Sequence, residues 1–253
     1  MIDTHCHVYE EEMNNYKEII EECNKNDISL IINAVDIKSS KDIINLSKTY
    51  NNSYSAIGLN YDTIDRVTRD DLVELEKLIK NEDIKAIGEI GLDYYWTKEN
   101  KDKQIEFFKA QIFLAKKYDL PVIVHARESI QDVYDILKES GIKKGSMHCY
   151  SGSLEMAKEF IKLGFKIGID GPITYKNNKK GIEVIKNIDL KDILLETDSP
   201  YLSPEPNRGK PNSPLNLIYI AKKIAEIKNI SVEEVIETTT NNAKELFKIW
   251  IMN

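Results

Sequence analysis

The chain has 253 residues, of which 42% are hydrophobic and 30% charged, and its formal net charge is −7. This length allows one large domain (1–253) with a sizeable core. The negative net charge disfavours wrapping of long duplex DNA, which requires clustered positive charge. No apolar run is long enough for a membrane span and the N-terminus lacks a signal pattern, so we expect a cytoplasmic protein. Three cysteines without a pairing pattern fit a reducing compartment.

Short β-type segments alternate with amphipathic helical segments along the chain. The predicted strands cover residues 2–8, 29–35, 54–59, 84–90, 121–126, 145–150, 165–169 and 193–198. The predicted helices cover residues 16–26, 39–50, 68–80, 101–118, 130–140, 154–163, 182–188, 215–227 and 232–247. This alternation predicts parallel pairing and an α/β fold, a single (β/α)8 TIM barrel with an extra C-terminal helix. An open doubly wound sheet is the alternative, and it usually has fewer strands.

The first predicted strand carries two histidines, His5 and His7, at a spacing of two residues. Side chains alternate between the two faces of a strand, so both imidazoles point the same way and Cys6 points the other way. Two imidazoles side by side on a strand can chelate one divalent metal ion. The same alternation turns Cys149 away from His148, and we interpret both cysteines as packing residues.

The remaining histidines and two carboxylates also lie at the ends of predicted strands. Glu89 lies at the end of the fourth strand, His125 of the fifth, His148 of the sixth and Asp198 of the eighth. Functional groups of TIM barrels lie at the C-terminal ends of the strands, so all these side chains are predicted to share one rim with His5 and His7. Each residue alone could be a helix cap or a loop residue, but the set uses every histidine in the chain.

Six nitrogen and oxygen ligands are more than one tetrahedral zinc ion needs, and they suit two metals about 3.5–4 Å apart. Glu89 is the natural bridge between them. The first metal would be held by His5, His7 and Asp198, and the second by His125 and His148. Asp198 is also the predicted general base. One or two divalent ions are expected, and Zn, Mn, Mg, Fe, Co and Ni all remain open.

The sequence resembles the TatD family of metal-dependent hydrolases and deoxyribonucleases, which belongs to the amidohydrolase superfamily. The resemblance covers essentially the whole chain, and its blocks are residues 3–7, 88–94, 124–127, 148–153, 195–202 and 208–214. It implies a TIM barrel, a centre of one or two metals and hydrolysis of phosphodiester bonds. The family resemblance thus agrees with the fold and the metal centre that the residues themselves predict.

Three further side chains are predicted to bind substrate. Arg127 shares a face with His125 and could grip a phosphate with its planar guanidinium, although a salt bridge with Glu128 is an equally good interpretation. Tyr201 near the rim could stack on a base, or it could simply wall a pocket. Arg208 lies in the long loop that follows the last strand.

We interpret the chain as a deoxyribonuclease, an exonuclease that trims single-stranded or frayed DNA ends in the 3′ to 5′ direction. A narrow barrel mouth admits a strand end more readily than the middle of a duplex. The alternatives are a small-molecule ester, amide or phosphoester hydrolase of the same superfamily, and a non-catalytic metal-binding protein. Basic groups around the mouth would favour the nuclease, whereas an apolar closed pocket would favour the small molecule. The sequence indicates no obligate protein partner.

Overall fold

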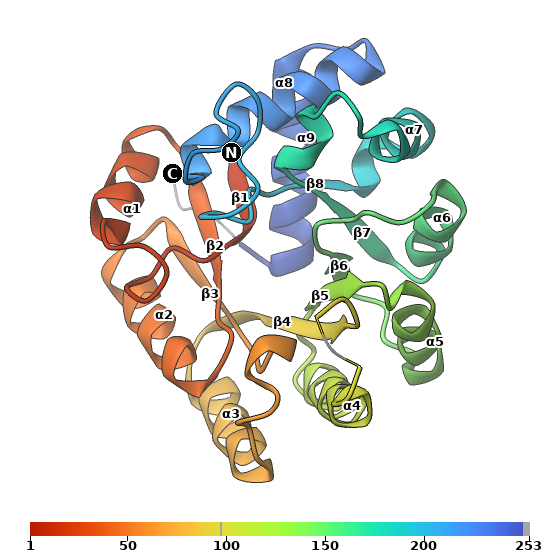
Figure 1. Cartoon of the computed structure of the whole chain (residues 1–253). Helices are drawn as coiled ribbons and strands as arrows, with labels where there is room; N and C mark the ends of the chain where they lie inside the picture. The colour runs from red at the N-terminus through yellow and green to blue at the C-terminus, as the bar shows by residue number, and fades with distance from the viewer. Residues whose placement is uncertain (97, 250–253) are drawn as a thin grey trace.

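The computed structural model describes residues 1–96 and 98–249. Its eight strands form one sheet in the order β1 to β8, and every neighbouring pair in that order is parallel. Figure 1 looks into the ring of strands, with helices around its outside. The strands are β1 (Ile2–Cys6), β2 (Ser29–Asn33), β3 (Ser53–Ile57), β4 (Ile84–Asp93), β5 (Val122–Arg127), β6 (Gly145–Met147), β7 (Phe165–Ile169) and β8 (Ile193–Leu195).

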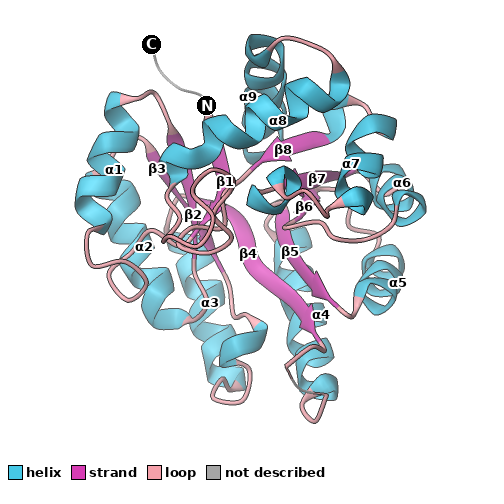
Figure 2. Cartoon of the chain, turned by 45° about the horizontal axis from the view of Figure 1, so that its top comes forward, coloured by secondary structure: helices cyan, strands magenta, loops and turns pink. Residues whose placement is uncertain are grey.

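The helices connect successive strands on the outside of the barrel, as the oblique view of Figure 2 also shows. Each buries an apolar stripe against the strands, because apolar residues recur with the helical period. They are α1 (Tyr16–Lys25), α2 (Ile37–Thr49), α3 (Arg69–Asn81), α4 (Lys101–Lys117), α5 (Ile130–Ser140), α6 (Leu154–Lys162), α7 (Lys179–Asn187), α8 (Leu217–Lys228) and α9 (Val232–Phe247). The predicted TIM barrel with an extra C-terminal helix is therefore confirmed.

Predicted boundaries differ from the observed ones mainly next to the rim. β6 and β8 end at Met147 and Leu195, three residues earlier than predicted, whereas β4 continues to Asp93. The chain leaves the ladder early because Cys149 and Asp198 adopt positive φ angles of 44° and 55°. Such left-handed backbone at non-glycine residues is uncommon and often marks a functional site.

The extra helix α9 closes the end of the barrel opposite the rim. Phe247 packs in a buried cluster with residues from several strands, among them Ile2, Ala56, Ala86 and Leu194. Apolar side chains fill this end, so the polar and charged side chains at the other end are the exception in the barrel interior. Among the described residues, no helix has both the length and the apolarity needed to cross a membrane.

Candidate active site

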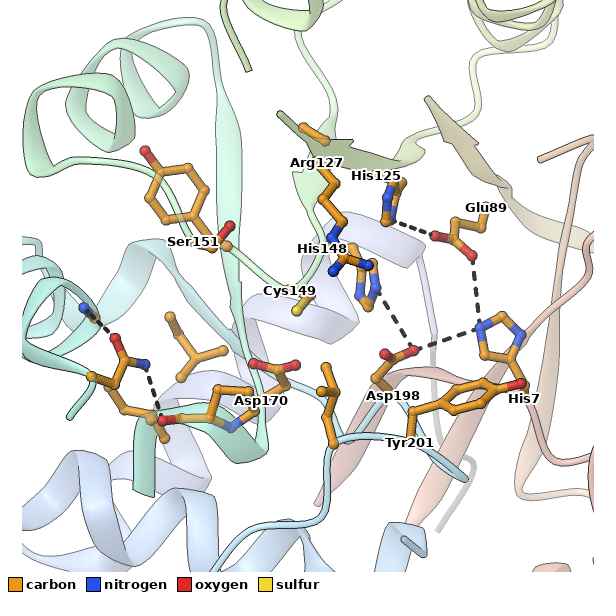
Figure 3. A pocket seen from close by; sticks show the side chains of 18 of the residues that line it. His7, Glu89, His125, Arg127, His148, Cys149, Ser151, Asp170, Asp198 and Tyr201 are labelled. Carbon is orange, nitrogen blue, oxygen red and sulfur yellow. Dashed lines mark hydrogen bonds and ion pairs between the residues drawn. The ribbon is translucent and has the colours of Figure 1, made fainter. Parts of the chain in front are cut away.

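The six predicted ligands converge at the C-terminal rim. Figure 3 shows His7, Glu89, His125, His148 and Asp198 pointing toward a common centre. Three overlapping sets have ligand atoms within 4.8 Å of one another: His5, His148 and Asp198; His5, His7 and Glu89; and Glu89, His125 and His148. We call His5, His7 and Asp198 the first group, and Glu89, His125 and His148 the second group.

The close approach of β4 to β5 places Glu89 beside His125. Gly91 pairs with His125 in the ladder and has a φ of 144°. A Cβ atom at Gly91 would lie 2.0 Å from the His125 carbonyl oxygen, so only glycine allows this approach. Glu89 Oε1 consequently lies 3.0 Å from His125 Nδ1, while Glu89 Oε2 faces the His5 and His7 rings at 3.8 and 3.7 Å.

Asp198 reaches the centre from the other side of the barrel. Its backbone N–H donates to the His5 carbonyl at 2.9 Å, which fixes its position beside β1. Its Oδ1 atom lies 3.6 Å from Nε2 of both His5 and His7, and 3.7 Å from His148 Nε2. The carboxylate thus faces both histidines of the first group and one histidine of the second group.

These separations fit ligands arranged around a metal ion. The distances of 3.6–3.8 Å between carboxylate oxygens and imidazole nitrogens exceed hydrogen-bonding range. Ligands bound at about 2.0–2.2 Å to one tetrahedral ion lie about 3.3–3.6 Å apart. Nitrogen and carboxylate oxygen are also the donor set that zinc, manganese, iron or cobalt prefers. The residues present therefore fit one or two divalent ions.

Three of the histidines are oriented by a hydrogen bond at the ring nitrogen that faces away from the centre. Such partners fix the tautomer and direction of a metal-binding imidazole. The pairs are His7 Nδ1 with the Asn33 carbonyl at 3.0 Å, His125 Nε2 with Asp93 Oδ2 at 2.9 Å, and His148 Nδ1 with Glu196 Oε1 at 3.0 Å. The buried Nδ1 atom of His5 has no hydrogen-bond partner among the described residues.

The pKa values of His5 and His148 are shifted in opposite directions. Burial and the neighbouring His148 hold the pKa of His5 well below its usual value, which keeps it a neutral imidazole. Burial also opposes the charging of His148, but Glu196 and Asp198 outweigh it and raise its pKa to about 10. Burial, the Glu89 carboxylate and the Asp170 carboxylate raise the pKa of Asp198. Bound cations would lower the pKa values of His148 and Asp198 and would keep His5 unprotonated, because a metal favours the ionised carboxylate and the unprotonated imidazole.

The centre opens into a cavity of about 860 Å³. His7, Glu89 and Asp198 line one side of it, which we call the metal wall. Arg127, Lys179 and Lys180 line the side formed by the end of β5 and the start of α7, which we call the basic wall. A cavity of this size is large enough for a ligand of many atoms in addition to metal ions.

The predicted substrate-binding residues lie in different places. The Arg127 guanidinium stacks on the Tyr95 ring at 3.7 Å, with Trp96 at 5.4 Å, and it lines the cavity. Tyr201 also lines the cavity, and its hydroxyl donates to Glu12 at 2.6 Å. Arg208 instead stacks on Tyr175 at 4.2 Å and is not among the cavity-lining residues, so its role stays a prediction.

Two cavity residues, Asp170 and Tyr61, were not predicted from the sequence, and a third, Cys149, was predicted to point elsewhere. Asp170, directly after β7, is 5% exposed, and burial together with Glu196 raises its pKa to about 7. The same strand-end signal that marked Asp198 could have found it. Tyr61 stacks on His125 with ring centroids 4.4 Å apart. Cys149 lines the cavity, contrary to the expectation that it turns away, because its positive φ breaks the strand alternation.

A model of the family described as TatD related DNase matches residues 2–248. Among curated proteins, the chain is 41% identical over 254 residues to YabD of Bacillus subtilis, covering 98% of this chain and 99% of that protein. It is 36% identical over 253 residues to MJ1582 of Methanocaldococcus jannaschii, with 98% and 96% covered. Both are described as uncharacterized metal-dependent hydrolases.

The fold agrees with solved structures of the same family. A crystal structure of YjjV, a TatD homologue from Escherichia coli, superposes with a TM-score of 0.92 at 29% identity, covering 99% of this chain and 98% of that chain. The barrel, the converging ligands and the match across nearly the whole chain together define a metal-dependent hydrolase. The chain belongs to the TatD family.

Proposed function

We propose that this protein hydrolyses phosphodiester bonds in DNA, and that it removes nucleotides from 3′ ends of single-stranded or frayed DNA. The observation that carries the proposal is the composition of one cavity. Five of the six ligands line it, with His5 buried directly behind them, and its basic wall presents Arg127, Lys179 and Lys180. A phosphodiester chain is an anion. The metal wall would act on the bond to be broken, and the basic wall would bind the negative charge of the chain.

The metal centre supplies the electrophile. Divalent ions bound by the two groups would acidify water and offset negative charge on the substrate phosphate. Glu89 spans both groups, because its Oε1 atom faces His125 and its Oε2 atom faces His5 and His7. Glu89 would therefore contribute to holding metal at both groups. His125 and His148 keep their orientation through Asp93 and Glu196.

Asp198 is the proposed general base. Its Oδ1 atom faces both groups at 3.6–3.7 Å, so it lies next to any water held between them. With cations bound nearby, the carboxylate is ionised and can accept a proton from that water at Oδ1 or Oδ2. The carboxylate is only 14% exposed, which limits competition from bulk water.

The cations of the basic wall have no carboxylate partner within 4.0 Å among the described residues, whereas many other lysines of this acidic chain do. Lys41, Lys48 and Lys117, for example, pair with glutamates at 2.9, 2.6 and 2.5 Å. Arg127 is held by aromatic rings instead of the expected alternative partner Glu128. Cations left unpaired around an active-site cavity are available for an anionic substrate.

The residues that border the cavity also support the nuclease hypothesis over the small-molecule hydrolase hypothesis. A pocket for a small neutral ester or amide would be expected to close over the metals with apolar side chains. Here Trp96, Arg127, Lys179 and Lys180 border the cavity, and all four are exposed. The aromatic ring of Trp96, 67% exposed, is also available to stack on a nucleobase.

A direct test uses single-stranded oligonucleotides labelled at either the 5′ or the 3′ end, with the metal-loaded protein. We expect a ladder of 5′-labelled products that shorten one nucleotide at a time and early release of the 3′ label. Chelation should abolish the reaction and a divalent transition metal should restore it. Full activity in a metal-free sample would contradict metal catalysis, and internal fragments appearing first would contradict the exonuclease assignment.

A further inference from the structure

The junction between β1 and β8 is built differently from the rest of the barrel. The other seven neighbouring pairs are joined by parallel ladders. β8 ends at Leu195, and beyond it the segment 196–199 continues beside β1. Two backbone hydrogen bonds join the segments there, from Asp198 N to the His5 carbonyl at 2.9 Å and from His7 N to the Ser199 carbonyl at 2.7 Å. All three residues of the first group lie at this junction.

A buried carboxylate completes the junction. Asp3 is 0% exposed, and its Oδ1 atom accepts from Thr197 N at 3.0 Å and from His5 N at 3.3 Å. Its Oδ2 atom accepts from the Thr197 hydroxyl at 2.5 Å. The side chain of Asp3 thus binds the Thr197 N–H across the junction, a position that a backbone carbonyl occupies in a regular ladder.

The hydrogen bonds continue from Asp3 to the neighbours of all three ligands. Thr197 Oγ1 also lies 2.8 Å from Ser199 Oγ, and the carbonyl of Ser199 accepts from His7 N. On the far side, Asn212 donates to the Thr197 carbonyl at 2.8 Å. Thr197, which precedes the proposed base Asp198, is therefore held at its amide, its hydroxyl and its carbonyl.

We propose that Asp3 is a positioning residue that sets the register between β1 and the segment 196–199, and so assembles the first metal group. The inference rests on the metal site of the proposed function. A slip of one residue along β1 would move the Asp198 N–H from the His5 carbonyl to that of Thr4 or Cys6, whose side chains point to the opposite face of the strand, and would carry the Asp198 carboxylate away from the His5 and His7 rings. A buried carboxylate is costly unless it is hydrogen-bonded, and the three donors to Asp3 belong to His5 and Thr197, which belong to or adjoin the first group.

The neighbouring residue offers a matched control. Thr4 is 1% exposed, and its hydroxyl also crosses the junction, donating to the Leu195 carbonyl at 3.1 Å. That bond lies within β8 and does not touch the segment that carries Asp198. Thr4→Val therefore removes a buried cross-junction hydrogen bond without releasing Thr197, and it reports what a merely structural contact contributes.

The experiment compares Asp3→Asn, Thr197→Val and Thr4→Val with the unaltered chain by stepwise calorimetric titration with Zn²⁺ and with Mn²⁺. A His125→Ala variant identifies which step belongs to the second group. Loss of an outer hydrogen-bond partner typically weakens metal binding by about 10–100-fold, and we expect this loss at the first group for Asp3→Asn and Thr197→Val. Second-group affinity should stay within about threefold, and Thr4→Val should change neither affinity by more than that.

Combining Asp3→Asn with Thr197→Val should weaken the first group no more than the worse single variant, because both break one contact. Wild-type affinity at the first group in folded Asp3→Asn would overturn the proposal, and so would an equal loss in Thr4→Val. If Asp3→Asn does not fold, Thr197→Val decides the question alone. Because metal binding is the readout, the two proposals can fail independently. A chain that binds metals but cleaves no DNA would refute the proposed substrate, whereas the metal affinities of the variants alone test the role of Asp3.

Discussion

The two walls of the cavity are built by different physical means. On the metal wall, His7 and Glu89 are at most 5% exposed and lie next to or within barrel strands. On the basic wall, Arg127, Lys179 and Lys180 are exposed, and two of them begin a helix rather than end a strand. The first arrangement holds reacting groups at fixed distances, whereas the second presents charge that adapts to a chain. We therefore expect that substitutions on the metal wall affect hydrolysis of every substrate, whereas substitutions on the basic wall affect the choice of substrate.

The metal wall should affect every substrate, and Asp198→Asn tests this with the largest expected effect. The amide cannot accept the proton, so the rate should fall by about 10²–10⁴-fold on a single-stranded oligonucleotide and on a neutral aryl ester alike. Metal content, measured alongside, should largely persist because His5 and His7 remain. Asp62→Asn is the control, since it removes a carboxylate that also lines the cavity but belongs to none of the ligand sets. A loss confined to one substrate would break the separation between the walls.

The difference between the walls also explains what the sequence could predict. His5, Glu89 and His125 lie in the C-terminal halves of strands and Asp198 follows one, and a barrel brings strand ends to one rim whatever the details of its loops. Their convergence was therefore predictable from spacing alone. The orienting partner Asp93 was missed because β4 runs three residues farther than its apolar run indicates.

The residues of the basic wall were less predictable, because their positions depend on the loops and on where a helix begins. Arg208 and Lys179 both follow strands at a distance, and nothing in the sequence shows that Lys179 lines the cavity while Arg208 stacks on Tyr175. The aromatic support of Arg127 by Tyr95 was equally hidden, because it depends on the path of the chain after β4. Asp170 is the exception, since its place after β7 gave the same signal as Asp198.

Arg127→Ala should separate the walls by substrate. A hydrogen bond to a charged group contributes about 1.5–3 kcal/mol, so oligonucleotide kcat/KM should fall by about 10- to 150-fold. The neutral aryl ester presents no anion and should be hydrolysed at nearly the original rate. Arg69→Ala is the control, because Arg69 is exposed and pairs with Glu106 on the outer helices. An equal loss on both substrates with unchanged metal content would show that Arg127 is structural.

Lys179 and Lys180 give the smallest effect and the sharpest view of how the basic wall works. Each phosphate contact with a single strand contributes about 0.7 to the slope of log affinity against log salt. Replacing both lysines by alanine should therefore lower the slope by about 1.4, so that the unaltered chain loses roughly sevenfold more affinity than the variant between 50 and 200 mM salt. Fluorescence anisotropy of a labelled oligonucleotide with the metal-loaded protein measures it. Lys176→Ala combined with Lys186→Ala makes the same charge change at exposed positions that do not line the cavity, and should leave the slope unchanged. If both double variants lower the slope equally, the net charge of the protein rather than the two cavity lysines attracts the strand. Arg127 would then be the remaining proposed phosphate contact of the basic wall.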